Sequence, residues 1–142
     1  MLLILSFILG GCTSQQARLL EKRHGDVLKS YREQVADTID DPKRAEQLIA
    51  IGEDLHLQIR RETKVILEMA AELKKLNSAY DTPRKELEAA LQNLNSQRAK
   101  MRDSILLARA EAMSLTTPAE WQKLINRRGT LLELIKETPG FL

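Results

Sequence analysis

Two long stretches of the chain carry apolar side chains at alternating spacings of three and four residues, and this periodicity constrains the fold most strongly. Such spacing places the side chains along one edge of a helix, as in coiled coils. Two seams joined by a short turn predict a long antiparallel hairpin. The first seam contains Leu48, Ile51, Leu55, Ile59, Glu62, Ile66, Met69, Leu73, Leu76 and Tyr80. The second contains Leu87, Leu91, Leu94, Arg98, Met101, Ile105, Ala108, Ala112 and Leu115.

Each seam is interrupted by one charged residue, Glu62 in the first and Arg98 in the second. Folding the chain at about residue 81 brings these two residues within one helical turn of each other. The sequence therefore predicts an ion pair that fixes the register of the hairpin, because an unpaired charge in the seam would cost about 3–5 kcal/mol. The alternative is that both side chains extend out of the seam along their methylene stems.

Three prolines follow residues that are suited to capping a helix, in Asp41-Pro42, Thr82-Pro83 and Thr117-Pro118. Proline is favoured at the first helical position, and an Asp or Thr before it accepts hydrogen bonds from free amides. Glu120, three residues after Thr117, completes a capping box. Together with a terminal Pro-Gly pair, the prolines predict four helices, over residues 16–39, 43–79, 83–114 and 118–137.

The composition agrees with an all-α fold. Charged residues make up 30% of the chain and aromatic residues only 4%, so good helix formers dominate. The first and last predicted helices carry weaker apolar stripes that suit packing against the hairpin. We therefore predict an elongated all-α bundle of three to four helices, built on a long antiparallel coiled-coil-like hairpin. The alternative is a bare hairpin whose outer helices are exchanged with a second chain.

The first eleven residues differ from the rest of the chain because they contain no charged side chain. Their apolar run is too short for a membrane span, which needs about 20 residues, and its length is typical of the core of a signal peptide. The following Leu9-Gly10-Gly11-Cys12 consists of an aliphatic residue, two small residues and a cysteine. This segment resembles the lipobox of bacterial lipoproteins.

The resemblance implies cleavage between Gly11 and Cys12, transfer of diacylglycerol to the Cys12 thiol, and acylation of the new amino end by a fatty acid such as palmitate. More than one acyl chain gives stable attachment without a protein span. Thr13, in place of the Asp that retains lipoproteins in the inner membrane, favours the outer membrane facing the periplasm in a two-membrane cell.

No Lys or Arg precedes Cys12, although a signal peptide normally begins with one. Either the start lies upstream, or the terminal amine supplies the positive charge. The alternative to a lipobox is an ordinary cytosolic helix with one buried cysteine. With the lipobox, the chain divides into a signal peptide (1–11), a lipid-anchored tether (12–15), a helical bundle domain (16–138) and a C-terminal tail (139–142).

The chain after Cys12 offers little material for catalysis. Glu53 and His56 are three residues apart and supply at most two metal ligands, whereas a structural zinc needs four. No serine neighbours a histidine, and no Gly-rich phosphate loop is present. We predict a protein that is not an enzyme, without catalytic residues, metal or cofactor. Trp121 is the only tryptophan and is predicted to anchor the core, with a partner contact as the alternative.

The net charge of +2 comes from interspersed basic and acidic residues, without the basic stripe of a nucleic-acid-binding protein. We predict contact with membrane lipid through acylated Cys12, and either a protein partner or self-association. The predicted role is a structural or protein-interaction module of the cell envelope.

A second role comes from the segment Leu115–Ala119, which resembles the Leu-Thr-x-x-Gln motif of small helical periplasmic stress chaperones and metal sensors. The resemblance implies a binding module of the chaperone or sensor type. Ala119 stands where the motif has glutamine, and a helix cap explains the same residues.

Overall fold

The computed structural model describes residues 12–126, and this part of the chain contains four helices and no strand. Side chains are described for Lys22 and from His24 onward. The predicted all-α helical bundle is confirmed. The helices are α1 (Cys12–Thr38), α2 (Pro42–Ser78), α3 (Arg84–Ser114) and α4 (Pro118–Asn126). The predicted signal peptide, the C-terminal tail and the predicted last helix beyond residue 126 lie outside the described residues.

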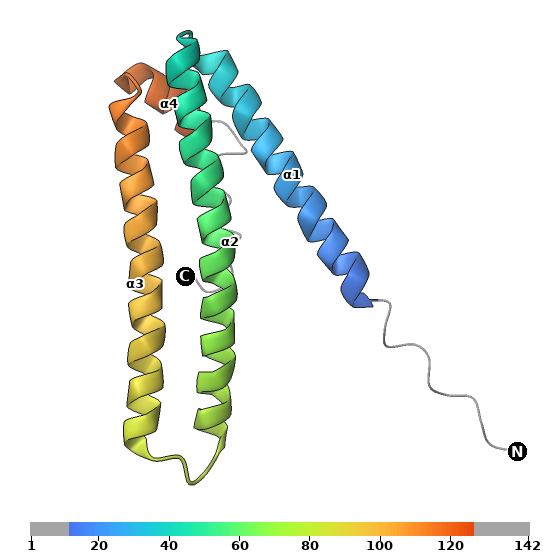
Figure 1. Cartoon of the computed structure of the whole chain (residues 1–142), viewed down its shortest axis with the longest axis vertical. Coiled ribbons are helices and arrows are strands. Elements are labelled where there is room, and N and C mark those ends of the chain that lie inside the picture. The colour runs from blue at the N-terminus through green and yellow to red at the C-terminus, as the bar shows by residue number, and fades with distance from the viewer. Residues whose placement is uncertain (1–11, 127–142) are drawn as a thin grey trace, which may run out of the picture.

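The hairpin of α2 and α3 forms the long axis of the molecule (Figure 1). The two helices lie antiparallel and side by side, and at 1.5 Å per residue the 37 residues of α2 extend about 55 Å. Helix α1 packs on α2 near the end away from the hairpin turn and then diverges from the hairpin toward its own N-terminus. The short α4 lies at the same end as this packing. No helix within residues 12–126 has the length and apolar character needed to cross a bilayer.

Two hydrophobic clusters hold the bundle together. The first joins all four helices at the end of the hairpin opposite its turn, and the second lies between α2 and α3 alone. Helix α1 therefore packs on the hairpin within one chain. The buried residues of the first cluster are Tyr31, Val35, Ile39, Leu48, Ala112 and Leu124. Those of the second are Leu55, Ile59, Ile66, Leu94 and Met101.

The first and third predicted helix caps are confirmed. The Asp41 carboxylate accepts hydrogen bonds from the amides of Lys43 and Arg44, at 2.9 and 3.2 Å. In the capping box, the Thr117 amide donates to the Glu120 carboxylate and the Glu120 amide donates to the Thr117 hydroxyl.

The second predicted cap is wrong. Helix α3 begins one residue after Pro83, and no side chain caps its first turn. The hydroxyl of Thr82 donates instead to the carbonyl of Leu76, at 2.7 Å, so Thr82 closes the end of α2. The last carbonyls of a helix lack intrahelical partners. In this hairpin the Thr82 side chain in the turn lies close enough to supply one.

The seam predicted on α2 is confirmed except at Tyr80, which lies fully exposed in the hairpin turn. The seam on α3 is rotated by part of a turn. Leu94, Met101 and Ala112 are buried as predicted, whereas Leu91 and Arg98 are exposed. The small or polar residues that precede them by one position, Ala90 and Gln97, are half-buried instead.

Helix α1 begins at Cys12, four residues before the predicted start, so the segment predicted as a tether has a helical backbone. Only the C-terminal half of α1 contributes buried side chains among those described. The hydroxyl of Tyr31 donates to the carbonyl of Leu48 at 2.7 Å, and Arg32 forms an ion pair with Glu53 at 2.6 Å. These contacts fix the C-terminal half of α1 on the N-terminal half of α2.

Candidate functional site

A groove runs between α2 and α3 in the half of the hairpin that lies nearer its turn. We call it the tip groove. Its volume is about 670 Å³, and every described residue that lines it belongs to the two hairpin helices. Leu94 lies at the floor with 3% of its surface exposed, whereas Leu91 on the wall is 48% exposed. The lining residues are Ala70, Leu73, Lys74, Asn77, Arg84, Leu87, Glu88, Leu91, Leu94 and Arg98.

Part of the predicted α3 seam lines the tip groove. Leu87 and Leu91 were expected to contact α2 in the closed seam, and they line an open groove instead. A third helix packed along this half of the hairpin would cover them, but α1 contributes no lining residue and α4 lies at the other end. The apolar surface is therefore accessible in the described structure.

The predicted pair of Glu62 and Arg98 is not formed. The carboxylate of Glu62 accepts a hydrogen bond from the side-chain amide of Gln97, and Arg98 is exposed at the rim of the tip groove. Rotation of α3 places Gln97 in the position opposite Glu62. The sequence therefore predicted correctly that Glu62 makes a polar contact across the seam. The predicted partner, Arg98, was wrong by one residue, because Gln97 makes the contact.

A second polar contact crosses the hairpin one to two turns further from the turn. The side-chain amide of Gln58 donates to the hydroxyl of Ser104 at 2.7 Å, and that hydroxyl donates to the carbonyl of Lys100 at 3.0 Å. Both residues line a smaller groove of about 200 Å³, together with Leu107. No sequence pattern predicts this contact, because Gln and Ser are common at solvent-facing helix positions.

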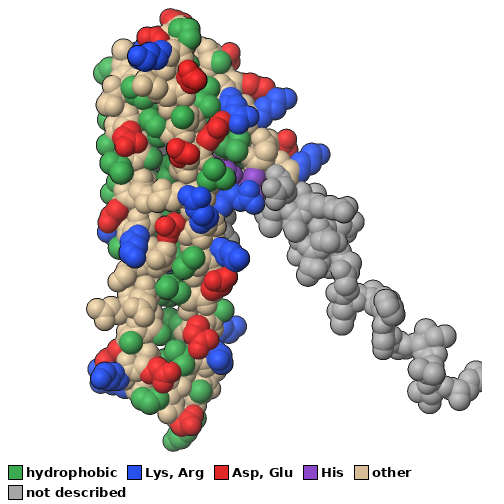
Figure 2. All heavy atoms as spheres, viewed as in Figure 1, with side chains coloured by type: hydrophobic (Ala, Val, Ile, Leu, Met, Phe, Trp, Pro, Cys, Tyr) green, Lys and Arg blue, Asp and Glu red, His purple; other side chains and the backbone are tan. Residues whose placement is uncertain are grey.

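The two histidines meet where α1 packs on α2, visible in purple in Figure 2. The ring centroids of His24 and His56 are 5.0 Å apart with an interplanar angle of 62°. His56 is buried, and among the described residues its Nε2 atom has no hydrogen-bond partner. Burial, with further effects of His24 and Arg60, lowers the pKa of His56. The imidazole is therefore neutral at pH 7.

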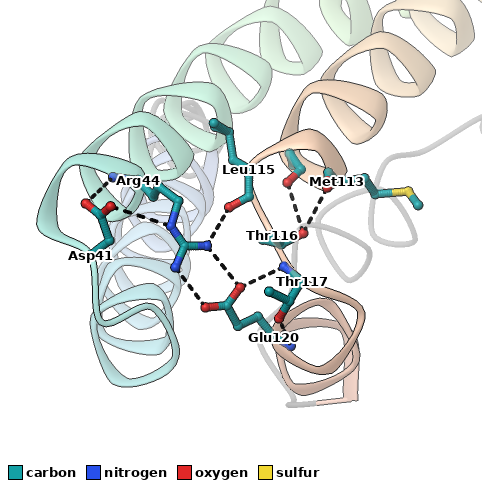
Figure 3. Close-up of polar contacts among 8 residues, drawn as sticks. Asp41, Arg44, Met113, Leu115, Thr116, Thr117 and Glu120 are labelled. Carbon is teal, nitrogen blue, oxygen red and sulfur yellow. Dashed lines mark hydrogen bonds and ion pairs between the residues drawn. The ribbon is translucent and has the colours of Figure 1, made fainter.

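Helix α4 is fixed to the start of α2 by a joint centred on Arg44 and Glu120 (Figure 3). The guanidinium donates to both carboxylate oxygens of Glu120, at 3.0 and 3.1 Å, and to the carbonyl of Leu115 at 3.0 Å. From α1, the side-chain amide of Gln34 donates to the carbonyl of Leu124 at 2.6 Å. A bidentate Arg–carboxylate pair of this kind fixes the relative orientation of the two side chains as well as their distance.

The Glu120 carboxylate also accepts the amide of Thr117 at 2.7 Å, so it has two sets of donors. The hydrogen bonds from Arg44, followed by that from Thr117, lower the pKa of Glu120 to about 2. Trp121 follows on α4, half-buried against the first cluster, with the Arg109 guanidinium 5.7 Å from its ring centroid. Trp121 therefore reports on whether α4 is docked.

We expect Glu120→Gln to loosen α4 without unfolding the hairpin. The substituted amide presents hydrogens to a guanidinium that itself only donates, so Arg44 loses a charged acceptor. Trp121 fluorescence should shift to longer wavelength and acrylamide quenching should increase, while far-ultraviolet circular dichroism stays nearly constant. Glu111→Gln, an exposed carboxylate on α3, is the matched control and should leave Trp121 unchanged.

The same joint predicts a pH dependence. Because the pKa of Glu120 is lower in the folded chain than its ordinary value of 4.5, its stabilisation is complete above pH 4.5 and is lost as the pH falls toward about 2. Wild-type Trp121 fluorescence should change across that window, and the Glu120→Gln variant should lack this part of the transition. A wild-type signal that matches the variant at every pH would contradict the assigned role of the joint.

The predicted attachment site lies at the first described residue. Cys12 begins α1, whereas Gly11 on the other side of the predicted cleavage lies outside the described residues. Within residues 12–126, no group of three or more His, Cys, Asp or Glu side chains is arranged to hold a metal ion.

No protein-family model matches the chain, and neither the curated proteins nor the solved structures contain a match.

Proposed function

We propose that the chain is a lipoprotein of the bacterial cell envelope, anchored by acyl chains on Cys12, whose hairpin is a docking surface for a partner protein. The anchor rests on the lipobox Leu9-Gly10-Gly11-Cys12. In a two-membrane cell, Thr13 favours the outer membrane with the bundle in the periplasm. The proposed role is binding rather than catalysis.

The tip groove is the observation that carries the docking role. Helical hairpins commonly bury their apolar groove under another helix of the same chain or of a partner. In the tip groove, Leu87 and Leu91 form apolar parts of the wall, and no described helix other than α2 and α3 supplies a lining residue. Burying such side chains contributes about 25 cal/mol per Å² of apolar surface, which gives a partner a substantial driving force.

The arrangement of the helices supports this role further. Helix α1 leads from the proposed anchor to the end of the hairpin opposite its turn (Figure 1). The tip groove lies in the half of the hairpin nearer its turn, and the hairpin is about 55 Å long. The N-terminal end of α1 lies apart from the hairpin and toward its turn side (Figure 1). A partner bound in the tip groove would contact neither α4 nor the first cluster, because neither supplies a lining residue.

Photo-crosslinking in cells tests the proposal. A photoreactive amino acid replaces Leu91 in the full chain, expressed with its own signal, and the membrane fraction is irradiated. We expect one discrete adduct that mass spectrometry identifies as a partner protein. The same substitution at Lys85, six residues earlier on α3, exposed and outside the groove, is the control and should give none.

Other outcomes reject the proposal in different ways. Absence of an adduct from position 91, or an equal yield from position 85, would exclude the groove as a docking surface. A heterogeneous set of adducts with many unfolded chains would favour chaperone-like binding. An adduct of twice the mass of the chain would assign the groove to self-association.

A further inference from the structure

We propose that the tip groove binds an amphipathic helix of a partner protein, one whose apolar stripe is bordered by acidic side chains. The proposal rests on the proposed function and names the chemistry of its partner. The shape of the groove, the charges on its rim and the position of its apolar floor each contribute to it.

The shape of the groove fits a helix. Two antiparallel helices form its walls, so the groove runs parallel to their axes, and the ridge of a third helix packs into such a groove. The apolar residues come from both walls, with Leu73 on α2 and Leu87 and Leu91 on α3. Residues 87, 91 and 94 continue one stripe of α3 for two turns, which matches the spacing of anchors on an amphipathic helix.

The rim of the groove is basic. Lys74, Arg84 and Arg98 line it together with one carboxylate, that of Glu88, so the net charge of the lining is +2 (three cations less one anion). Arg84 and Glu88 pair with each other at 2.7 Å. Lys74 and Arg98 form no ion pair among the described residues, and both are exposed. A partner with carboxylates beside its apolar stripe would complement these two cations.

The same charges disfavour a second copy of the chain in this groove. A two-fold interface would place a lining of +2 against an identical lining, because such an interface uses the same patch on both subunits. The recessed floor disfavours a membrane surface as the occupant. Leu94 is 3% exposed on the floor, so part of the apolar surface lies recessed between the helices, where a side-chain ridge reaches and a flat bilayer does not.

Binding of a synthetic peptide to the full chain, purified in detergent, tests the proposal. The probe is a fluorescent helical peptide with leucines at i, i+3, i+4 and i+7 and glutamates beside them. A second peptide carries lysine in place of each glutamate. We expect the acidic peptide to bind, the basic peptide to bind at least about tenfold more weakly, and binding of the acidic peptide to weaken with added salt.

Charge reversal on the rim should act in the same direction. Arg98→Glu should weaken binding of the acidic peptide by about tenfold and improve binding of the basic one. Lys85→Glu makes the same change of charge on an exposed position of α3 outside the groove, and should change either affinity by less than about twofold. Unchanged circular dichroism would show that both variants are folded.

Any of four results would overturn the proposal. The two peptides could bind equally, or Lys85→Glu could act as strongly as Arg98→Glu, which would make the attraction non-specific. Vesicles of mixed zwitterionic and anionic phospholipid could displace the peptide in a manner that depends on Arg98, which would assign the groove to a membrane. A discrete crosslink from Leu91 in cells without any peptide binding would reject the acidic helix while the docking function stands.

Discussion

The Cys12→Ala variant should carry no lipid, whereas all of the processed wild-type chain should carry it. In the proposed lipoprotein, diacylglycerol is attached to the Cys12 thiol, which alanine lacks. Each buried methylene contributes about 0.8 kcal/mol, so loss of all acyl chains removes the attachment rather than weakening it. Intact-mass measurement and detergent partitioning of both proteins, expressed with their own signal, report the difference.

Two comparisons make this result decisive. Ser14→Ala changes a residue just after the lipobox and should be processed and lipidated like the wild type. If the wild-type and Cys12→Ala chains both have unmodified masses and stay in the aqueous phase, the lipobox is coincidental and Cys12 is an ordinary thiol. The proposal of an envelope lipoprotein would then fall, and the helical bundle would remain.

Gly52→Ala should destabilise the bundle by about 2 kcal/mol, although alanine is the better helix former. A Cβ atom at position 52 would lie 2.2 Å from Cε1 of Tyr31 and 2.7 Å from its Cζ. The ring cannot move freely, because it is 7% exposed and its hydroxyl donates to the Leu48 carbonyl. Burial of the ring, and to a smaller extent the negative charge of Glu53, raises the pKa of Tyr31 to about 12. The hydroxyl therefore keeps its proton at neutral pH.

Gly25→Ala is the matched control, since this glycine lies in the same bundle within α1 and a Cβ there meets nothing within 4 Å. It should stabilise the protein by about 0.5–1 kcal/mol through helix propensity. Urea unfolding of both variants measures the two changes in free energy. A Gly52→Ala variant as stable as the Gly25→Ala variant would contradict the close packing of α1 on α2.

A double substitution separates the steric effect from other causes. In a Tyr31→Ala background, which removes the ring, Gly52→Ala should become stabilising by about 1 kcal/mol. The Tyr31→Ala substitution alone should cost about 3–5 kcal/mol, because it leaves a cavity in the first cluster. If the sign of the Gly52 effect does not reverse, the ring of Tyr31 is not what excludes a side chain at that position.

The candidate site shows how far a stripe of residues predicts a surface. Leu87, Leu91 and Arg98 were identified from their spacing and were assigned to a closed seam, whereas they line the tip groove. An apolar stripe identifies a face of a helix that is about 100° wide or more. It does not determine which edge of that face meets the neighbouring helix, because this depends on side chains supplied by the neighbour.

The sequence by itself determined the features that act over one or a few helical turns. The spacing of apolar residues defined the hairpin, and local hydrogen-bonding chemistry defined the caps at Asp41 and Thr117. These features need no distant partner, since residues i to i+4 meet on the same helix whatever the rest of the chain does.

Only the tertiary structure decided the contacts between residues far apart in the chain. It gave Glu62 the partner Gln97, set the ring of Tyr31 against Gly52, and joined Arg44 to Glu120 across 76 residues. Each of these depends on the relative rotation and crossing of two helices, which many side chains determine together. The spacing within one helix carries no information about that rotation, so the sequence pattern left these contacts open.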